Sequence, residues 1–194
     1  RARVAEPEVA YEGDWIYITI KIDEGPRYEM GTVEVEGDVI FAEHKLFETI
    51  SIDEEAYYSR AVIRNDVLNL TDLYADDGYA RADVAPRISY RQGADVVDIA
   101  YHITKNQPVY FEKIVIEGNT KTRDKVIRRE LHVYEQEKYS SSRLKRSVRN
   151  LYRLEYFEDV KVKTLPGTTD EQMVLNIDVT EKSTGSFSTC RGYS

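Results

Sequence analysis

The chain alternates between two hydrophobic periods, one of two residues and one of about three and a half. Residues 96–104 largely alternate between apolar and polar side chains, which is typical of a half-buried strand. A longer segment upstream has apolar side chains at the spacing of one buried helical face: Ile63, Val67, Leu70 and Tyr74. The chain is therefore predicted to mix short strands with amphipathic helices.

This hydrophobic pattern occurs twice in the sequence. Val35-Glu36-Gly37 returns 81 residues later as Ile116-Glu117-Gly118. The same offset pairs Ile63, Val67, Leu70 and Leu73 of the long helix with a second apolar set: Leu144, Val148, Leu151 and Leu154. Farther along, the offset falls to 78, because the first copy has three extra residues. Apolar residues of one segment fall on apolar residues of the other at a nearly constant offset, which indicates an internal repeat.

One repeating unit is predicted to have the order β-α-α-β-β. Its parts are a strand at 32–36, a short helix at 43–50, the long helix, and strands at 80–90 and 96–104. Pro86 places the second strand at an edge, since proline cannot donate to a ladder. The fold class is therefore α+β, with tandem three-stranded mixed sheets in the order 2-3-1, each covered on one face by two helices. The proline-bearing connections should limit movement between units, with apolar packing at the joints by Tyr28, Met30, Tyr110 and Phe111.

The composition also indicates the cellular compartment of the protein. The 194 residues carry a formal net charge of −8 and a single cysteine, Cys190, which suits an oxidising compartment. No apolar run approaches the roughly 20 residues that a membrane-spanning helix needs. No signal peptide heads the chain, so we expect the sequence to be part of a longer protein.

Charge is unevenly distributed between the two copies. Residues 121–153 hold eleven Lys and Arg against four Asp and Glu, a net charge of +7. The equivalent residues 40–72 hold three against seven, a net charge of −4. The basic helix pair is either a product of random drift or a docking face for an acidic protein or anionic headgroups.

No catalytic, cofactor or metal site is expected. His44 and Glu48 share a helix face, but two ligands do not make a metal site. His102 has the place of an outward-facing polar residue on a strand, and the serine run 140–142 is better suited to helix capping than to nucleophilic chemistry. The protein is therefore predicted not to be an enzyme.

Three stretches carry a family resemblance: "IVIEGNTKTRDKVIRREL", "LYRLEYFEDVKV" and "VTEKSTGSFS". Together with the β-α-α-β-β unit, they resemble the POTRA (polypeptide-transport-associated) family of the outer-membrane barrel assembly and translocation superfamily. The sequence departs from the pattern at Glu155, where the family often has Gly, and at Cys190, where small residues are usual. The resemblance implies a periplasmic arm that continues into a membrane β-barrel, receives unfolded outer-membrane proteins and docks accessory lipoproteins.

The resemblance also divides the chain. The predicted segments are the C-terminal hairpin of a preceding POTRA domain at 1–28, a complete domain at 29–107, a complete barrel-proximal domain at 108–184, and a junction to the membrane barrel at 185–194.

Two sets of binding residues are predicted. The family's partner-binding helix matches 125–135, which implies lipoprotein docking by Arg128, Arg129, Glu130 and Glu135. The second strands, as sheet edges, are expected to bind client strands by β-augmentation. The client-binding residues are Arg81, Ala82, Asp83, Val84, Ala85, Glu158, Asp159, Val160 and Lys161.

Other functions stay open at this point. The arm could belong to a related autotransporter-assembly or two-partner secretion transporter, although the latter carry two such domains and this sequence has parts of at least three. A nucleic-acid-binding module would use the basic helix pair, but a pI of about 5.1 and the lack of an aromatic and basic motif on a central strand argue against nucleic acid as a partner. A structural spacer would bind no unfolded polypeptide.

Overall fold

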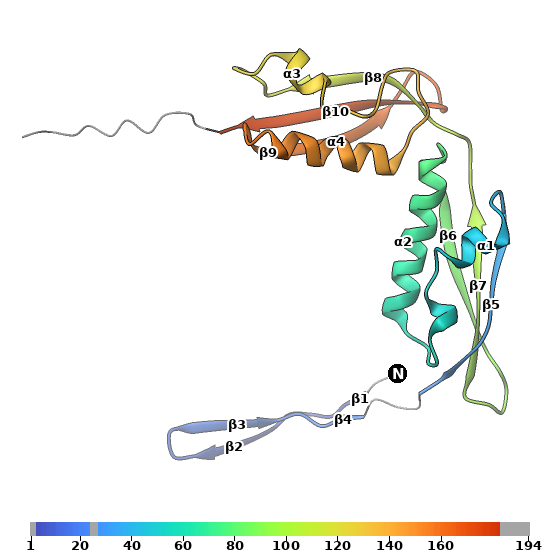
Figure 1. Ribbon diagram of the computed structural model, residues 1–194. Helices are drawn as coiled ribbons and strands as arrows, with labels where there is room; N and C mark the ends of the chain where they lie inside the picture. Colours follow the sequence, from blue (N-terminus) through green and yellow to red (C-terminus); the bar gives the residue numbers. More distant parts are fainter. Residues whose placement is uncertain (1–2, 24–26, 183–194) are drawn as a thin grey trace, which may run out of the picture.

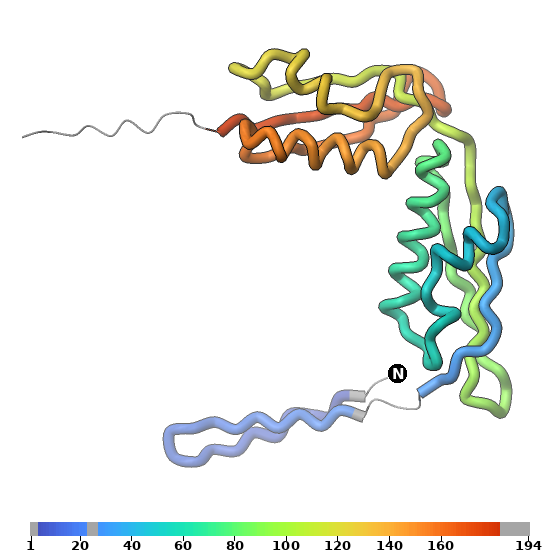
Figure 2. The backbone as a smooth tube through the Cα atoms, viewed as in Figure 1, coloured from blue at the N-terminus to red at the C-terminus, as the bar shows by residue number. Residues whose placement is uncertain are grey.

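The computed structural model describes residues 3–23 and 27–182. Two successive α+β units follow an N-terminal hairpin of four short strands (Figures 1 and 2). We call the sheet-and-helix body around residues 29–107 the first unit and that around 108–182 the second unit. The predicted barrel junction and Cys190 lie outside the described residues.

The first unit has the predicted sheet. Its elements are β5 (Glu29–Gly37), α1 (Glu43–Phe47), a 3-10 turn (Ile52–Glu54), α2 (Arg60–Asp76), β6 (Asp83–Tyr90) and β7 (Val96–Thr104). The strand order is β5-β7-β6, with β5 parallel and β6 antiparallel to β7. The predicted order 2-3-1 is confirmed.

The second unit repeats this arrangement. Its elements are β8 (Tyr110–Glu117), α3 (Asp124–Arg128), α4 (Ser141–Arg153), β9 (Phe157–Pro166) and β10 (Gln172–Glu181). The strand order is β8-β10-β9, again with one parallel and one antiparallel pairing.

Several predicted boundaries were wrong. The second strand begins at Asp83 rather than at 80, so Arg81 and Ala82 precede it. The short helix ends at Phe47 rather than at 50, and the first strand is longer than predicted. The long helix begins where the hydroxyl oxygen of Ser59 accepts a hydrogen bond from the Val62 amide.

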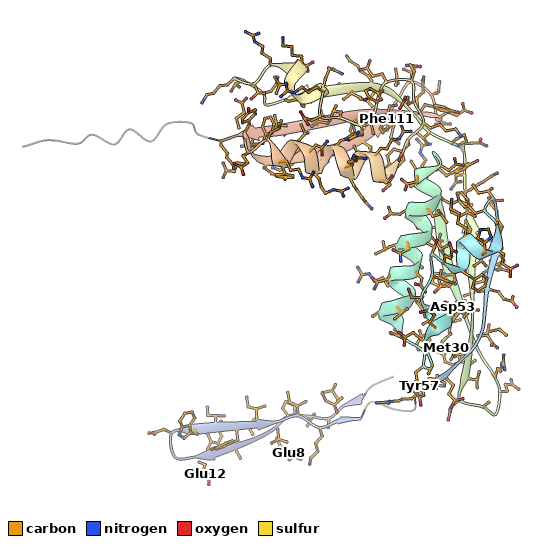
Figure 3. All side chains as sticks on the ribbon, viewed as in Figure 1. Glu8, Glu12, Met30, Asp53, Tyr57 and Phe111 are labelled. Atoms are coloured by element: carbon orange, nitrogen blue, oxygen red, sulfur yellow. The ribbon has the colours of Figure 1, made fainter. Side chains whose placement is uncertain are left out.

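The cores form where alternate residues of the central strands meet the helices. On β7 these residues are almost completely buried, and so are their equivalents on β10: Val97, Ile99, Tyr101 and Ile103, then Met173, Leu175, Ile177 and Val179. Figure 3 labels Phe111, which is fully buried in the second core beside the ring of Tyr139. Met30 packs on the first core, so both residues contribute to the cores of their own units.

One carboxylate lies inside the first core. Asp66 of α2 is fully buried and accepts hydrogen bonds from the backbone amides of Ser51 and Ile52, at 2.8 and 3.1 Å. The Tyr101 hydroxyl donates to the same carboxylate at 2.9 Å. Burial, and then the neighbouring Asp66, raise the pKa of Tyr101 far above its usual value. This cluster fixes the turn before α2 to the central strand.

Hydrogen bonds cross the joint between the units, where Ala80 also packs on the second core. The Val109 amide donates to the carbonyl of Gly78 at 2.8 Å, and Arg81 donates through Nη1 to the carbonyl of Asp170 at 2.8 Å. The C-terminal end of α2 meets the N-terminal end of α4 (Figure 1). Among residues 3–23 and 27–182, hydrogen bonds therefore join the two units at these three places.

The N-terminal strands are β1 (Arg3–Val4), β2 (Glu8–Glu12), β3 (Trp15–Thr19) and β4 (Ile22–Asp23). β2 pairs with β3 and β1 with β4, both antiparallel. Large apolar side chains stay exposed on this hairpin, with Tyr11 at 76% and Trp15 at 72%. That exposure fits the proposal that the segment is the last hairpin of another unit, whose helices would cover it.

Candidate functional site

The hydrogen bonds between β6 and β7 determine which backbone groups of β6 lie at the free edge of the sheet. The Arg91 amide donates to the carbonyl of Val96 at 3.0 Å, which turns the odd-numbered residues of β6 toward β7. The even-numbered residues therefore present their amides and carbonyls to the outer edge. Pro86 is one of them, so its missing N–H costs no ladder bond.

This alternation divides the predicted client-binding residues of the first unit. Asp83 and Ala85 bond toward β7, and only Val84 faces outward. The strand also offers the outward backbone groups of Ile88 and Tyr90, which the sequence prediction missed. Arg81 instead holds the joint between the units.

The edge of β9 follows the same rule. The Gly167 amide donates to the carbonyl of Gln172 at 3.0 Å, so even-numbered residues face outward. The outward amide of Val160 donates to the Tyr152 hydroxyl oxygen at 3.1 Å, which closes that position. Tyr152 also donates to Asp159, and this bond lowers the pKa of the Asp159 carboxyl. Val162 and Thr164 are the outward positions beyond it.

An apolar groove runs beside each of these edges. In the first unit it lies between α2 and β6, has a volume of about 370 Å³, and is lined by Tyr58, Arg60, Ile63, Arg64, Val67, Pro86, Ile88 and Tyr90. In the second unit it lies between α4 and β9, has a volume of about 540 Å³, and is lined by Tyr139, Leu144, Lys145, Val148, Arg149, Val162 and Thr164. The grooves are built from equivalent positions of the repeat.

The predicted partner-docking residues are partly occupied within the fold. Arg128 bonds through Nε to Asp124 at 2.7 Å and through Nη2 to the carbonyl of Ile114 at 3.0 Å. Glu135 accepts from the Ile114 amide at 2.9 Å. Arg129 and Glu130 pair with each other at 3.2 Å. Arg128 and Glu135 therefore have a structural role at the β8 edge, whatever else they bind.

A second set of cations was missed in the sequence. Arg146, Arg149 and Arg153 are exposed along α4 and have no ion-pair partner among the described residues. Their spacing of three and four residues puts them on one helix face, a signal that the sequence already carried. By contrast, Arg143 pairs with Glu137 at 2.8 Å and Lys145 with Asp72 at 2.5 Å. We call Arg146, Arg149 and Arg153 the α4 basic face.

The remaining candidates have structural roles or none. Ser140 caps α4, with its hydroxyl oxygen accepting from the Arg143 amide. His102 lies 3.1 Å from Glu36 on the uncovered sheet face. Within residues 3–23 and 27–182, no group of three or more His, Cys, Asp or Glu could hold a metal, and no helix is long and apolar enough to cross a membrane.

Known proteins agree with this architecture. The sequence matches the POTRA family, described as a surface antigen variable number repeat, at residues 28–106 and 109–182. It is 34% identical over its whole length to the outer membrane protein assembly factor BamA of Nitratidesulfovibrio vulgaris, and 30% identical over 98% of its length to BamA of Neisseria meningitidis serogroup B. The chain spans about a quarter of these relatives, 25% and 24%.

Solved structures show the same fold. The chain superposes on Haemophilus influenzae BamA POTRA3-5 with a TM-score of 0.77 at 18% identity, covering 93% of this chain and 73% of that one. For BamA of Haemophilus ducreyi lacking POTRA domains 1-3 the TM-score is 0.72 at 22% identity, covering 82% and 30%.

The resemblance stated from the sequence is therefore confirmed. BamA POTRA domains are the periplasmic part of an outer-membrane protein, and the predicted periplasmic location is confirmed with it. On the sequence match, which covers both α+β units, and on the shared fold, this chain belongs to the POTRA family.

Proposed function

We propose that this chain is part of the periplasmic arm of an outer-membrane protein assembly factor, and that it binds unfolded outer-membrane polypeptides as added strands along β6 and β9. The function is non-catalytic. One observation carries the proposal: each unit places an apolar groove beside an unpaired strand edge, at equivalent positions of the repeat.

The physical argument starts from the client. An unfolded barrel protein is a series of strands that differ in side chains and share a backbone, so backbone pairing can hold all of them. The outward groups of Ile88 and Tyr90, and of Val162 and Thr164, supply such pairing. Alternate client side chains would enter the grooves and add weak selectivity. A short pairing of this kind gives low affinity, as release to the next step requires.

A proline scan of outward positions tests the proposal. Ile88→Pro removes one outward N–H and keeps the ladder to β7, whereas Ile88→Ala shortens the same side chain and keeps the N–H. In the second unit, Val162→Pro and Val162→Ala form the matched pair. Asp83 is unsuitable because it pairs with Thr104 inside the sheet.

The readout is a titration of the full chain with peptides copied from outer-membrane strands, followed by backbone amide NMR. We expect shifts at Ile88, Tyr90, Val162 and Thr164, with binding weakened by the proline variants about tenfold more than by the alanine variants. Equal binding by each matched pair, in domains shown to be folded, would contradict the proposal, as would shifts confined to the helices.

A second function rests on the α4 basic face. We infer that it docks an acidic surface of an accessory lipoprotein of the assembly complex, with Arg129 and Glu130 at its margin. Three exposed cations on one ridge attract an acidic partner over about a Debye length. Arg128 and Glu135 contribute indirectly, since they fix the segment that carries Arg129.

A further inference from the structure

Each sheet has a second edge strand, β5 in the first unit and β8 in the second. The side chains beside this edge differ between the two units. In the second unit, two side chains close the outer edge of β8 at Ile114. Glu135 accepts from the amide of Ile114 at 2.9 Å, and Arg128 donates to the carbonyl of the same residue at 3.0 Å. The two side chains also approach each other, at 3.7 Å. We call this pair the edge bracket.

The first unit lacks the edge bracket. The repeat offset of 81 residues places Phe47 at the position of Arg128, Glu54 at that of Glu135 and Val33 at that of Ile114. Phenylalanine has no group that could bond to a strand edge. Among the described residues, Glu54 has no hydrogen-bond or ion-pair partner through its side chain.

The backbone of β5 confirms which groups face outward. The Asp38 amide donates to the carbonyl of Ile103 at 2.9 Å, which turns Glu34 and Glu36, beyond the bulge after Met30, toward β7. Val33 and Val35 therefore direct their amides and carbonyls away from the sheet. Within residues 3–23 and 27–182, neither residue has a backbone hydrogen-bond partner on that side.

The first residues of β5 are not available at this edge, because they already pair with another segment of the first unit. The Met30 amide donates to the carbonyl of Ala56 at 3.2 Å, and β5 forms a bridge between Glu29 and Tyr57 (Figure 3 labels Met30 and Tyr57). Beyond that point, a groove of about 360 Å³ lies between β5 and α1. It is lined by Val33, Glu34, Val35, Val39, Glu43, Leu46 and Phe47.

The charge of the groove beside β5 indicates which kind of polypeptide would bind there. Glu34 and Glu43 line the groove and have no ion-pair partner among the described residues. Side chains alternate on a strand, so Glu34 and Glu36 lie on the uncovered sheet face, and Val33 and Val35 on the helix face. A strand added beside β5 would place cations opposite Glu34 and apolar side chains against Val33 and Phe47.

We propose that the β5 edge of the first unit binds an extended polypeptide segment in which apolar residues alternate with Lys or Arg. The site is distinct from the β6 and β9 edges and does not depend on their function. The edge bracket excludes the same ligand from β8, so the first unit binds one such segment and the second unit binds none at this edge.

The test uses the whole chain and a short peptide of alternating valine and lysine residues. Amide NMR is expected to show shifts at Val33 and Val35. A peptide with glutamate in place of lysine, and one N-methylated at alternate residues, should each bind at least about tenfold more weakly. Glu34→Lys with Glu43→Lys should weaken the lysine peptide to a similar extent without unfolding the unit, since both side chains are at the surface.

Exchanging the edge bracket provides a second arm. Phe47→Arg should close the β5 edge with the help of Glu54, and Phe47→Leu serves as the control that leaves it open. Arg128→Phe with Glu135→Ala should open β8 and add a second site, with shifts at Ile114. Binding that survives Phe47→Arg in a folded chain, equal affinity for the glutamate peptide, shifts at Ile88 and Tyr90 instead, or no binding of the lysine peptide would each overturn the proposal.

Discussion

The carboxylate of Asp76, at the end of α2 in the first unit, accepts a hydrogen bond from the backbone amide of Ser142, in the first turn of α4 in the second unit, at 2.6 Å. The first amides of a helix have no partner within it, and a side chain usually caps them from the preceding residue. Here Ser140 and Asp76 share that role, so one unit caps a helix of the other.

The cap makes the joint depend on particular carboxylates. Asp72 adds a hydrogen bond from the Ser141 hydroxyl at 2.8 Å and the ion pair with Lys145. Burial alone would raise the pKa of Asp72, but the bonds from Lys145 and Ser141 outweigh it and hold the pKa below the usual value. At neutral pH the ionised Asp72 carboxylate therefore keeps its bonds to Ser141 and Lys145 across the joint.

We predict that Asp72→Ala with Asp76→Ala loosens the joint while both units stay folded. The lost cap costs about 1 kcal/mol of helix stability, which each core can absorb. NMR rotational correlation times, measured for each unit separately, should diverge in the variant and agree in the parent chain. Asp77→Ala is the matched control, since the Asp77 side chain makes no bond to the second unit among the described residues. Unchanged, common tumbling in the double variant would contradict the prediction.

A second prediction concerns the buried carboxylate. Asp66→Ala should destabilise the first unit by about 2–4 kcal/mol, because the amides of Ser51 and Ile52 and the hydroxyl of Tyr101 lose a buried acceptor. Hydrogen exchange of the β7 amides should accelerate accordingly, while exchange in β10 stays unchanged. Asp53→Ala, at an exposed position on the neighbouring 3-10 turn, should alter neither.

The sequence predicted the repeat and the sheet order because both depend on local periodicity. The alternation of β7 and the helix face of Ile63 and Leu70 are visible residue by residue. The usable strand edge was not, because the outward set depends on register, which the single bond from Arg91 to Val96 fixes. The repeat offset already aligns Phe47 with Arg128 in the sequence. Which way either side chain points could be learned only from the structure.

A third prediction concerns the α4 basic face. Arg146→Glu with Arg153→Glu should weaken binding of an acidic accessory lipoprotein at least about tenfold at moderate salt, and less at high salt, because screening removes the attraction. Stability should change by less than about 0.5 kcal/mol, since both side chains are exposed. Calorimetric titration with the soluble lipoproteins measures this. The same charge reversal at Arg60 and Arg64 of α2 is the control, and equal losses there would show a nonspecific charge effect.

The last prediction follows from the Glu181 carboxylate at the end of β10. It accepts hydrogen bonds from the backbone amide of Thr122 at 2.6 Å and from the Thr120 hydroxyl at 2.9 Å, which ties the turn before α3 to the sheet. Hydrogen bonding, led by the Thr122 side chain, lowers the pKa of Glu181 from 4.5 to about 2. A lowered pKa means that the ionised form binds better in the folded state, so this stabilisation is complete above pH 4.5 and is lost as the pH falls toward 2.

Thermal unfolding at pH 7 and at pH 3 should therefore separate the parent chain from Glu181→Gln. The parent loses part of the contribution of Glu181 between pH 7 and pH 3, whereas the variant lacks it at both, so the difference in melting temperature between them should be larger at pH 7. The variant is expected to speed amide exchange at Lys121 and Thr122 at neutral pH, where the carboxylate no longer holds the turn. Glu171→Gln, an exposed substitution on the β9–β10 hairpin, controls for the loss of one negative charge. A melting-temperature difference that is the same at both pH values would show that ionisation of Glu181 does not stabilise the second unit.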